Sequence, residues 1–259
     1  MSDAQAHLLK KIIFSGTITA LTGLHIGGSE VGLQIGGADK VVVRNPRDNT
    51  PYVPGSSLKG RMRSLLERAY CTDHADFVDG DKHGPCKCAD CDVCRVFGVS
   101  IAEKHKDRLQ AGRLLVRDAM MTNADQVKRM PNLLTDYTEL KTEVSIDRLT
   151  SAANPRNFER VPAGAVFGFE LVLNVFEGDD ESKFIALIEE GLRLVGYDAL
   201  GGQSSRGYGR VRITLEHRAE PNLADFLSDQ TLKAALDKNA MTGPLTWPAE
   251  DSAREPAAA

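Results

Sequence analysis

The 259-residue chain lacks any uninterrupted apolar stretch of about eighteen residues, the length that a membrane-spanning helix needs. Its first residues, MSDAQAHLLKK, contain no apolar core and no small-residue cleavage site of the kind that marks a secretory signal. The chain also has no excess of positive charge, since its formal net charge at pH 7 is −4. These absences favour a cytoplasmic protein without a membrane partner, and they leave a nucleic-acid partner undecided.

The negative charge is concentrated at one end of the chain. Residues 219–259 carry seven acidic and three basic side chains, so residues 1–218 contain twenty-nine of each sign and are neutral. A neutral body still forms a basic groove if its lysines and arginines gather on one face. With 42% hydrophobic and 26% charged residues the composition is globular. We therefore expect one large domain over 1–218, followed by an acidic extension over 219–259.

Four of the five cysteines fall within nine residues, in the segment HGPCKCADCDVC. In a reducing compartment such spacing predicts a metal site rather than disulfides. Zinc takes four tetrahedral nitrogen or sulfur ligands, and two non-overlapping pairs are expected to supply them. These pairs are His83 with Cys86 and Cys91 with Cys94, while Cys88 is a substitute ligand. A zinc ion held in this way has no open position and would be structural. Cys71, which stands apart, is expected to be a buried or half-buried thiol.

Hydrophobic periodicity predicts four strands and two helices in the order β-α-β-β-α-β, which is the order of the ferredoxin-like, or RRM-like, α+β fold. The strands are expected over 12–20, 113–118, 166–176 and 208–217, the helices over 55–70 and 181–197, and a further helix around 223–237. Three insertions interrupt the pattern, at about 21–55, 71–112 and 119–164. Loops of this length in a compact domain are usually functional.

The first predicted helix carries features that suit a phosphate group. Ser56 or Ser57 is expected to cap its first turn. The free N–H groups of that turn favour anions, and Ser57 is a candidate contact for RNA beside them. Lys59 and Arg63 lie four residues apart and therefore share one face of the helix. The alternative is an ordinary solvated helix face.

Two later segments present basic residues without core periodicity. The loop LGGQSSRGYGR, at 200–210, places Ser205 and Arg206 among glycines that permit close backbone approach, although many such loops are plain turns. The segment 139–164 is expected to be a protruding hairpin or arm that lies on a partner. Its arginines are Arg148, Arg156 and Arg160. Because the aromatic residues with which an RRM stacks bases are missing from the predicted strands, RNA would bind through backbone contacts and insertions.

Two candidates for chemistry lie in the glycine-rich insertion over 21–55. Asp39, in IGGADK, could hold a divalent metal or orient a ribose hydroxyl toward its own phosphate. His25, in GLHIGG, could act as a general base. The alternatives are a solvated loop carboxylate for Asp39 and a loop hydrogen bond for His25.

Taken together, these motifs resemble one family over about residues 10–217. They are GLHIGG (23–28), IGGADK (35–40), PGSSLKGRMRSLLE (54–67), CDVCRVFG (91–98), ELKTEVSIDRLTSAANPRNFERVPAG (139–164) and LGGQSSRGYGRV (200–211). The family is the RAMP backbone subunit of type III CRISPR effectors, Csm type. The resemblance implies a ferredoxin-like palm with a thumb and a fingers-like insertion. Copies of it would stack along a guide RNA, beside other effector subunits, while the guide pairs with target RNA.

The resemblance also assigns roles to residues. Asp39 would carry out the cleavage of target RNA with Mg²⁺ or Mn²⁺, and the guide backbone would contact His25, Lys59, Arg63 and the 200–210 loop. Two other functions remain open: a purely architectural guide-binding backbone in which Asp39 is not catalytic, and a RAMP endonuclease that processes precursor guide RNA by itself.

Overall fold

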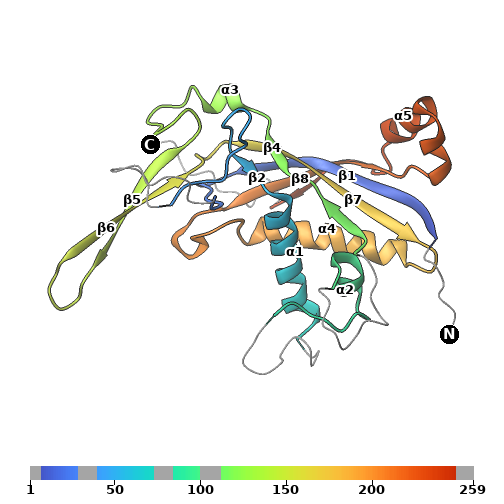
Figure 1. The fold of residues 1–259 in the computed structure, drawn as a ribbon, viewed down its shortest axis with the longest axis horizontal. Coiled ribbons are helices and arrows are strands. Elements are labelled where there is room, and N and C mark those ends of the chain that lie inside the picture. Colours follow the sequence, from blue (N-terminus) through green and yellow to red (C-terminus); the bar gives the residue numbers. More distant parts are fainter. Residues whose placement is uncertain (1–6, 29–39, 73–83, 100–111, 249–259) are drawn as a thin grey trace.

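The computed structural model describes residues 7–28, 40–72, 84–99 and 112–248, and its centre is an antiparallel sheet (Figure 1). Strand β1 (Leu8–Ala20) lies between β7 (Val166–Phe176) and β8 (Val211–Ala219). Alternate residues of β1 point to the core, so that Ile12, Phe14 and Ile18 are fully buried. The strand expected over 12–20 is confirmed and begins four residues earlier.

Two helices cover one face of this sheet (Figure 1). They are α1 (Gly55–Tyr70) and α4 (Glu181–Tyr197), and both match the predicted ranges. The helices approach closely at Gly191, where a Cβ atom would lie only 3.1 Å from the Met62 side chain. Together with the strand order β4-β7-β1-β8, the two helices confirm the predicted ferredoxin-like arrangement.

The start of α1 differs from its prediction. The N-cap residue is Pro54, whose side chain cannot accept a hydrogen bond, and the Gly55 N–H donates to the Asp118 carboxylate at 2.8 Å. The expectation that Ser56 or Ser57 caps this helix is therefore wrong. The Asp118 carboxylate thus occupies the N–H group at which the sequence suggests a phosphate.

The strand expected over 113–118 is present but shorter than predicted, a second short strand follows it, and both pair with β7. These are β3 (Leu114–Val116) and β4 (Ala119–Met121), and β2 (Tyr52–Val53) pairs with β4 at the sheet edge. Since β4 belongs to the sheet, the predicted insertion over 119–164 begins after Met121. The short helices α2 (Asp92–Phe97) and α3 (Ala124–Val127) lie in the second and third insertions.

The third insertion forms a two-stranded hairpin that extends away from the palm (Figure 1). Strands β5 (Glu139–Ile146) and β6 (Ala153–Arg160) pair over their full length, from Glu139 with Arg160 to Ile146 with Ala153. Most side chains toward the tip are exposed, and Leu149 at the turn is 98% exposed. The predicted protruding hairpin is confirmed.

The acidic C-terminal segment packs against the palm. It contains a short 3-10 helix η3 (Leu223–Leu227), helix α5 (Asp229–Asp237) and strand β9 (Leu245–Trp247), which pairs with β8. The helix expected around 223–237 is present, whereas β9 was missed because three residues are too few to show alternation. Within the described ranges, no helix is both long and apolar enough to cross a membrane.

Candidate functional sites: a cysteine metal centre and the base of the hairpin

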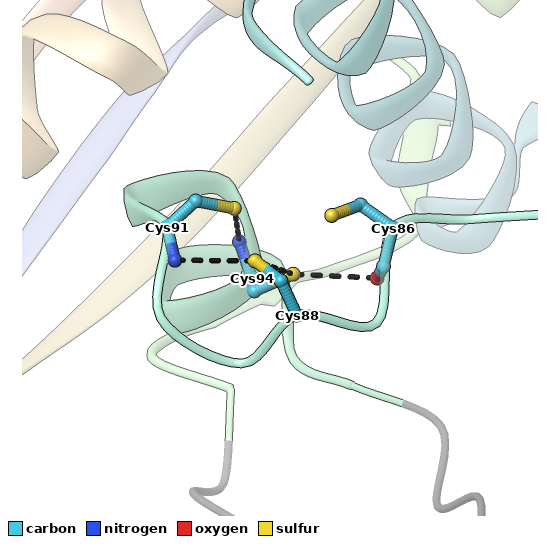
Figure 2. A group of neighbouring side chains, drawn as sticks. All are labelled: Cys86, Cys88, Cys91 and Cys94. Atoms are coloured by element: carbon cyan, nitrogen blue, oxygen red, sulfur yellow. Dashed lines mark hydrogen bonds between the residues drawn. The ribbon is translucent and has the colours of Figure 1, made fainter. Parts of the chain in front are cut away.

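The four clustered cysteines converge in space (Figure 2). Cys86 and Cys88 lie on the loop before α2, Cys91 is its N-cap residue, and Cys94 lies within it. Their sulfur atoms all lie within 4.8 Å of one another, and the sulfurs of Cys88 and Cys94 are 3.9 Å apart. A tetrahedral zinc with Zn–S bonds of about 2.3 Å requires sulfur–sulfur separations of about 3.8 Å. The residues therefore fit a four-thiolate metal site.

The thiols influence one another electrostatically in a way that suits a metal. The Cys91 sulfur accepts the Cys94 backbone N–H at 3.4 Å. Hydrogen bonding from Cys94, aided by Cys88 and Cys71, holds the pKa of Cys91 at about 4. Hydrogen bonding to Cys91 and burial raise the pKa of Cys94, and burial raises that of Cys86 to about 11. The cluster thus favours one thiolate, and a cation would stabilise the others as thiolates.

Cys88 is a full member of the group of four sulfurs that converge, not a substitute at its margin. His83, one of the four ligands preferred from the sequence, lies outside the described residues. Cys71 is buried as expected, but it is not isolated, because its sulfur lies 3.9 Å from that of Cys91. The sequence does not predict this contact, because the two cysteines are twenty residues apart and meet only where α1 ends, at its C-cap residue Cys71.

The two basic residues of α1 contact the protein itself. Lys59 Nζ donates to the Leu114 carbonyl at 2.7 Å, and desolvation, together with Arg63, lowers the pKa of Lys59. Arg63 donates to Glu67, to the Gly98 carbonyl and to the Cys86 carbonyl, at 2.7, 2.8 and 2.9 Å. Arg63 is thus bound to the cysteine loop, and its contacts favour that role over the expected grip on a phosphate. Ser57 is half-buried in the first turn.

Three sequence motifs meet at the base of the hairpin. Leu24 pairs with Val161 just after β6, and the Gly209 N–H donates to the Gly23 carbonyl. The loop over 200–209 approaches the segment around His25 so closely that a Cβ on Gly201, at φ +81°, would lie 2.4 Å from the His25 carbonyl oxygen. This close approach requires glycine at position 201.

His25 is part of this packing. It is 5% exposed, and its Nδ1 lies 2.7 Å from the Glu159 carbonyl oxygen. These contacts favour the alternative of a hydrogen bond within the protein over the expected contact with RNA or role as a general base.

The buried Tyr208 joins the loop over 200–210, the glycine loop, to the hairpin. Lys141 Nζ and the Arg160 guanidinium lie 4.6 and 5.0 Å from the centre of the Tyr208 ring. Arg206 forms an ion pair with Glu143 of β5 at 2.8 Å. Burial, followed by the Glu143 carboxylate, raises the pKa of Tyr208 to about 12. Sequence reasoning missed Lys141 and Tyr208, although a tyrosine between two glycines was a signal.

The basic candidates at this end differ in accessibility. Arg148 and Arg156 are exposed on the hairpin, and Ser205 and Arg206 are exposed on the glycine loop. Arg160 is half-buried, stacks on Tyr208 and donates to Glu139 at 2.6 Å. The exposed set lies on two neighbouring elements, which suits contacts with a polyanion.

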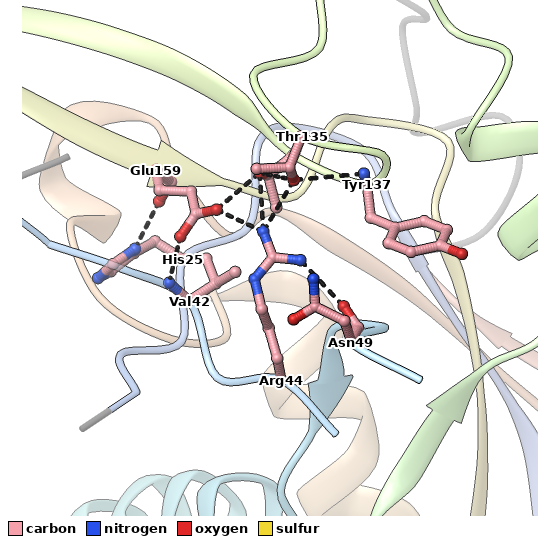
Figure 3. Close-up of polar contacts among 8 residues, drawn as sticks. His25, Val42, Arg44, Asn49, Thr135, Tyr137 and Glu159 are labelled. Carbon is pink, nitrogen blue, oxygen red and sulfur yellow. Dashed lines mark hydrogen bonds and ion pairs between the residues drawn. The ribbon is translucent and has the colours of Figure 1, made fainter. Parts of the chain in front are cut away.

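A buried ion pair fastens the glycine-rich insertion to the hairpin (Figure 3). Glu159 of β6 binds the Arg44 guanidinium, and it accepts from the Thr138 hydroxyl at 2.7 Å and the Val42 N–H at 2.9 Å. Asp39 lies outside the described residues, but the next residue, Lys40, pairs with Phe158 of β6. The chain therefore leaves the base of the hairpin one residue from Asp39. Neither Arg44 nor Glu159 was singled out from the sequence.

Comparisons with known proteins agree with these features. Residues 17–212 match the RAMP superfamily. The chain is 42% identical over 215 residues to "CRISPR system Cms endoribonuclease Csm3" of Methanothermobacter thermautotrophicus, covering 79% of this chain and 84% of that protein. The protein of the same name from Streptococcus thermophilus is 41% identical over 78% of this chain and 86% of its own length.

Solved structures share the fold. The crystal structure of a Csm3–Csm4 subcomplex in the type III-A CRISPR–Cas interference complex gives a TM-score of 0.54 at 26% identity, covering 87% of each chain. Methanopyrus kandleri Csm3 gives 0.61 at 24% identity, covering 86% of this chain and 80% of that one. The chain therefore belongs to the RAMP superfamily, within the family of Csm3 endoribonucleases.

Proposed function

We propose that this chain is a repeating backbone subunit of a type III CRISPR effector, in which it binds guide RNA and cleaves complementary target RNA. The observation that carries the proposal is the pairing of Lys40 with Phe158, because it anchors the neighbour of Asp39 at the base of the exposed hairpin. Relatives that are named endoribonucleases support the RNA-cleaving activity. We place the chain in the cytoplasm, and its partners would be further copies of itself and other effector subunits.

RNA binding would rely on exposed cations rather than on aromatic stacking. Arg148, Arg156 and Arg206, with Ser205, offer donors to phosphates on the hairpin and the adjoining loop. Phosphate contacts position a nucleic acid without reading its sequence, which suits a protein that leaves sequence recognition to guide–target pairing. Arg160 contributes less directly, because it also holds Tyr208 and Glu139.

For the cleavage step we propose in-line attack of a ribose 2′-hydroxyl on the adjacent phosphorus. The hydroxyl loses its proton, the bond to the 5′-oxygen breaks, and the products carry a 2′,3′-cyclic phosphate and a 5′-hydroxyl. Asp39 would orient the nucleophile or accept its proton, and a divalent cation, Mg²⁺ or Mn²⁺, would stabilise the phosphate charge. The hairpin would keep the target nucleotide splayed next to this carboxylate.

We also infer that Cys86, Cys88, Cys91 and Cys94 hold one structural Zn²⁺. The support is the mutual approach of four sulfurs on one nine-residue segment, half of them buried. Replacing zinc by Co²⁺ tests the ligand set, since a four-thiolate site and a site with one imidazole differ in their absorption spectra. His83→Ala should leave the cobalt spectrum unchanged, whereas Cys88→Ser should alter it. The reverse result would restore His83 as the fourth ligand.

The decisive experiment for the RNase activity is Asp39→Ala in the reconstituted complex. Target cleavage should be lost while guide binding, target binding and assembly persist. A 2′-deoxy nucleotide beside the scissile phosphate should also block cleavage. Normal cleavage by Asp39→Ala would support the architectural alternative, and cleavage of precursor guide RNA by the isolated chain would support the processing alternative.

A further inference from the structure

The buried ion pair between Arg63 and Glu67 of α1 lies directly against the cysteine loop. Glu67 is only 4% exposed, and its Oε1 accepts from Arg63 Nε at 2.7 Å and from the Cys86 backbone N–H at 3.0 Å. Arg63 Nη2 donates to the carbonyl of the same Cys86 at 2.9 Å. The ion pair therefore binds both the N–H and the carbonyl group of Cys86, the first cysteine of the cluster.

The same arginine also holds the far end of the loop. Its Nη1 donates to the Gly98 carbonyl at 2.8 Å, and Gly98 is the residue that ends α2. The Gly98 N–H in turn donates to the Cys94 carbonyl at 2.9 Å. One guanidinium thus joins the beginning and the end of the segment that carries all four sulfurs, and it does so from a helix of the palm.

Rigid backbone support matters for a metal site, because ligands that are already in position lose less conformational freedom when the ion binds. The planar fork of Arg63 directs three separate nitrogens at two carbonyls and a carboxylate, whereas all donors of a lysine share one nitrogen and cannot be spread in this way. Arginine is not a metal ligand, and the Glu67 carboxylate is not part of the described group of converging ligand atoms. Any effect of this pair on the site therefore passes through the cysteine backbone.

We propose that Arg63 and Glu67 are positioning residues that form the outer shell of the cysteine metal site and determine how tightly it retains its ion. The inference rests on the proposed zinc site and adds to it the residues that preorganise it. It also assigns Arg63 to the metal site in place of the phosphate grip expected from the sequence.

The test measures zinc retention by the full-length chain, loaded with one Zn²⁺, in competition with a chromophoric chelator. Arg63→Ala should weaken the apparent affinity by about 10- to 100-fold, the usual effect of removing an outer-shell partner. The matched control is Arg61→Ala. Arg61 lies on the same helix and also donates to a carbonyl and a carboxylate, those of Ala199 and Asp198, but away from the cysteines. The Arg61→Ala variant should retain zinc as tightly as the wild type does.

Two conservative variants keep the test decisive if Arg63→Ala does not fold. Arg63→Lys preserves the positive charge and Glu67→Gln preserves the side-chain shape. Both should release zinc faster than the wild type while their circular dichroism in excess zinc stays native. Wild-type retention by both variants would overturn the inference. A wild-type chain that binds no zinc would instead refute the proposed metal site itself, so the two failures are distinguishable.

Discussion

The ion pair between Arg44 and Glu159 offers a sharp test of how the glycine-rich insertion is fastened to the hairpin. Glu159→Ala removes one carboxylate that serves three donors: the Arg44 guanidinium, the Thr138 hydroxyl and the Val42 N–H. Only 5% of the Glu159 side chain and 17% of the Arg44 side chain are exposed, so water cannot fully replace the lost acceptor.

The expected cost follows from these contacts. Removing one partner of a buried ion pair typically costs about 3–5 kcal/mol. Arg44 would keep its bonds to Thr135 and to the Asn49 carbonyl, so we expect the lower end, about 3 kcal/mol. Glu159→Gln keeps the size but turns one acceptor into a donor, and it should cost about 1–3 kcal/mol.

Urea unfolding of the zinc-loaded chain measures this difference. With an m-value of about 3 kcal/mol/M, Glu159→Ala should lower the midpoint by about 1 M without changing m. Asp136→Ala is the control, because both side chains of its ion pair with Lys128 are more than half exposed and such a pair is worth about 1 kcal/mol or less. If Glu159→Ala destabilises the chain no more than Asp136→Ala does, the buried pair does not hold the insertion in place.

Four further changes have definite expected outcomes. Arg206→Ala should weaken guide binding equally for unrelated sequences and lower the salt slope by roughly 0.7, as a binding titration at several salt concentrations would show. Gly209→Ala should destabilise the fold by at least about 1–3 kcal/mol in thermal unfolding, because φ is +73° and the Leu200 carbonyl blocks the new Cβ. The raised pKa of Tyr208, about 12, stabilises the fold below pH of about 10, and this contribution should be lost as the pH rises toward 12, but not in Tyr208→Phe. Cys71→Ala should still bind one zinc per chain by elemental analysis, and loss of the metal would make Cys71 a ligand.

Long periodic segments could be predicted from the sequence because their own residues decide their structure. The alternation in β1 and the helical spacing of Leu58, Met62 and Leu66 each require one buried face, and that requirement is local. The cysteine cluster was equally predictable, because four thiols within nine residues lie close together in a compact loop. The family motifs added the expected site at Asp39.

The functions of individual polar side chains were decided only by tertiary structure. The sequence suggests a phosphate contact for Arg63 and a reactive role for His25. The fold places the carbonyls of Cys86 and Gly98 against Arg63, and the Glu159 carbonyl against His25. Strand β9 exists because β8 offers it an edge, not because its three residues prefer to be a strand. Periodicity reports which face of an element is buried, whereas a hydrogen-bond partner distant in sequence appears only when the chain has folded.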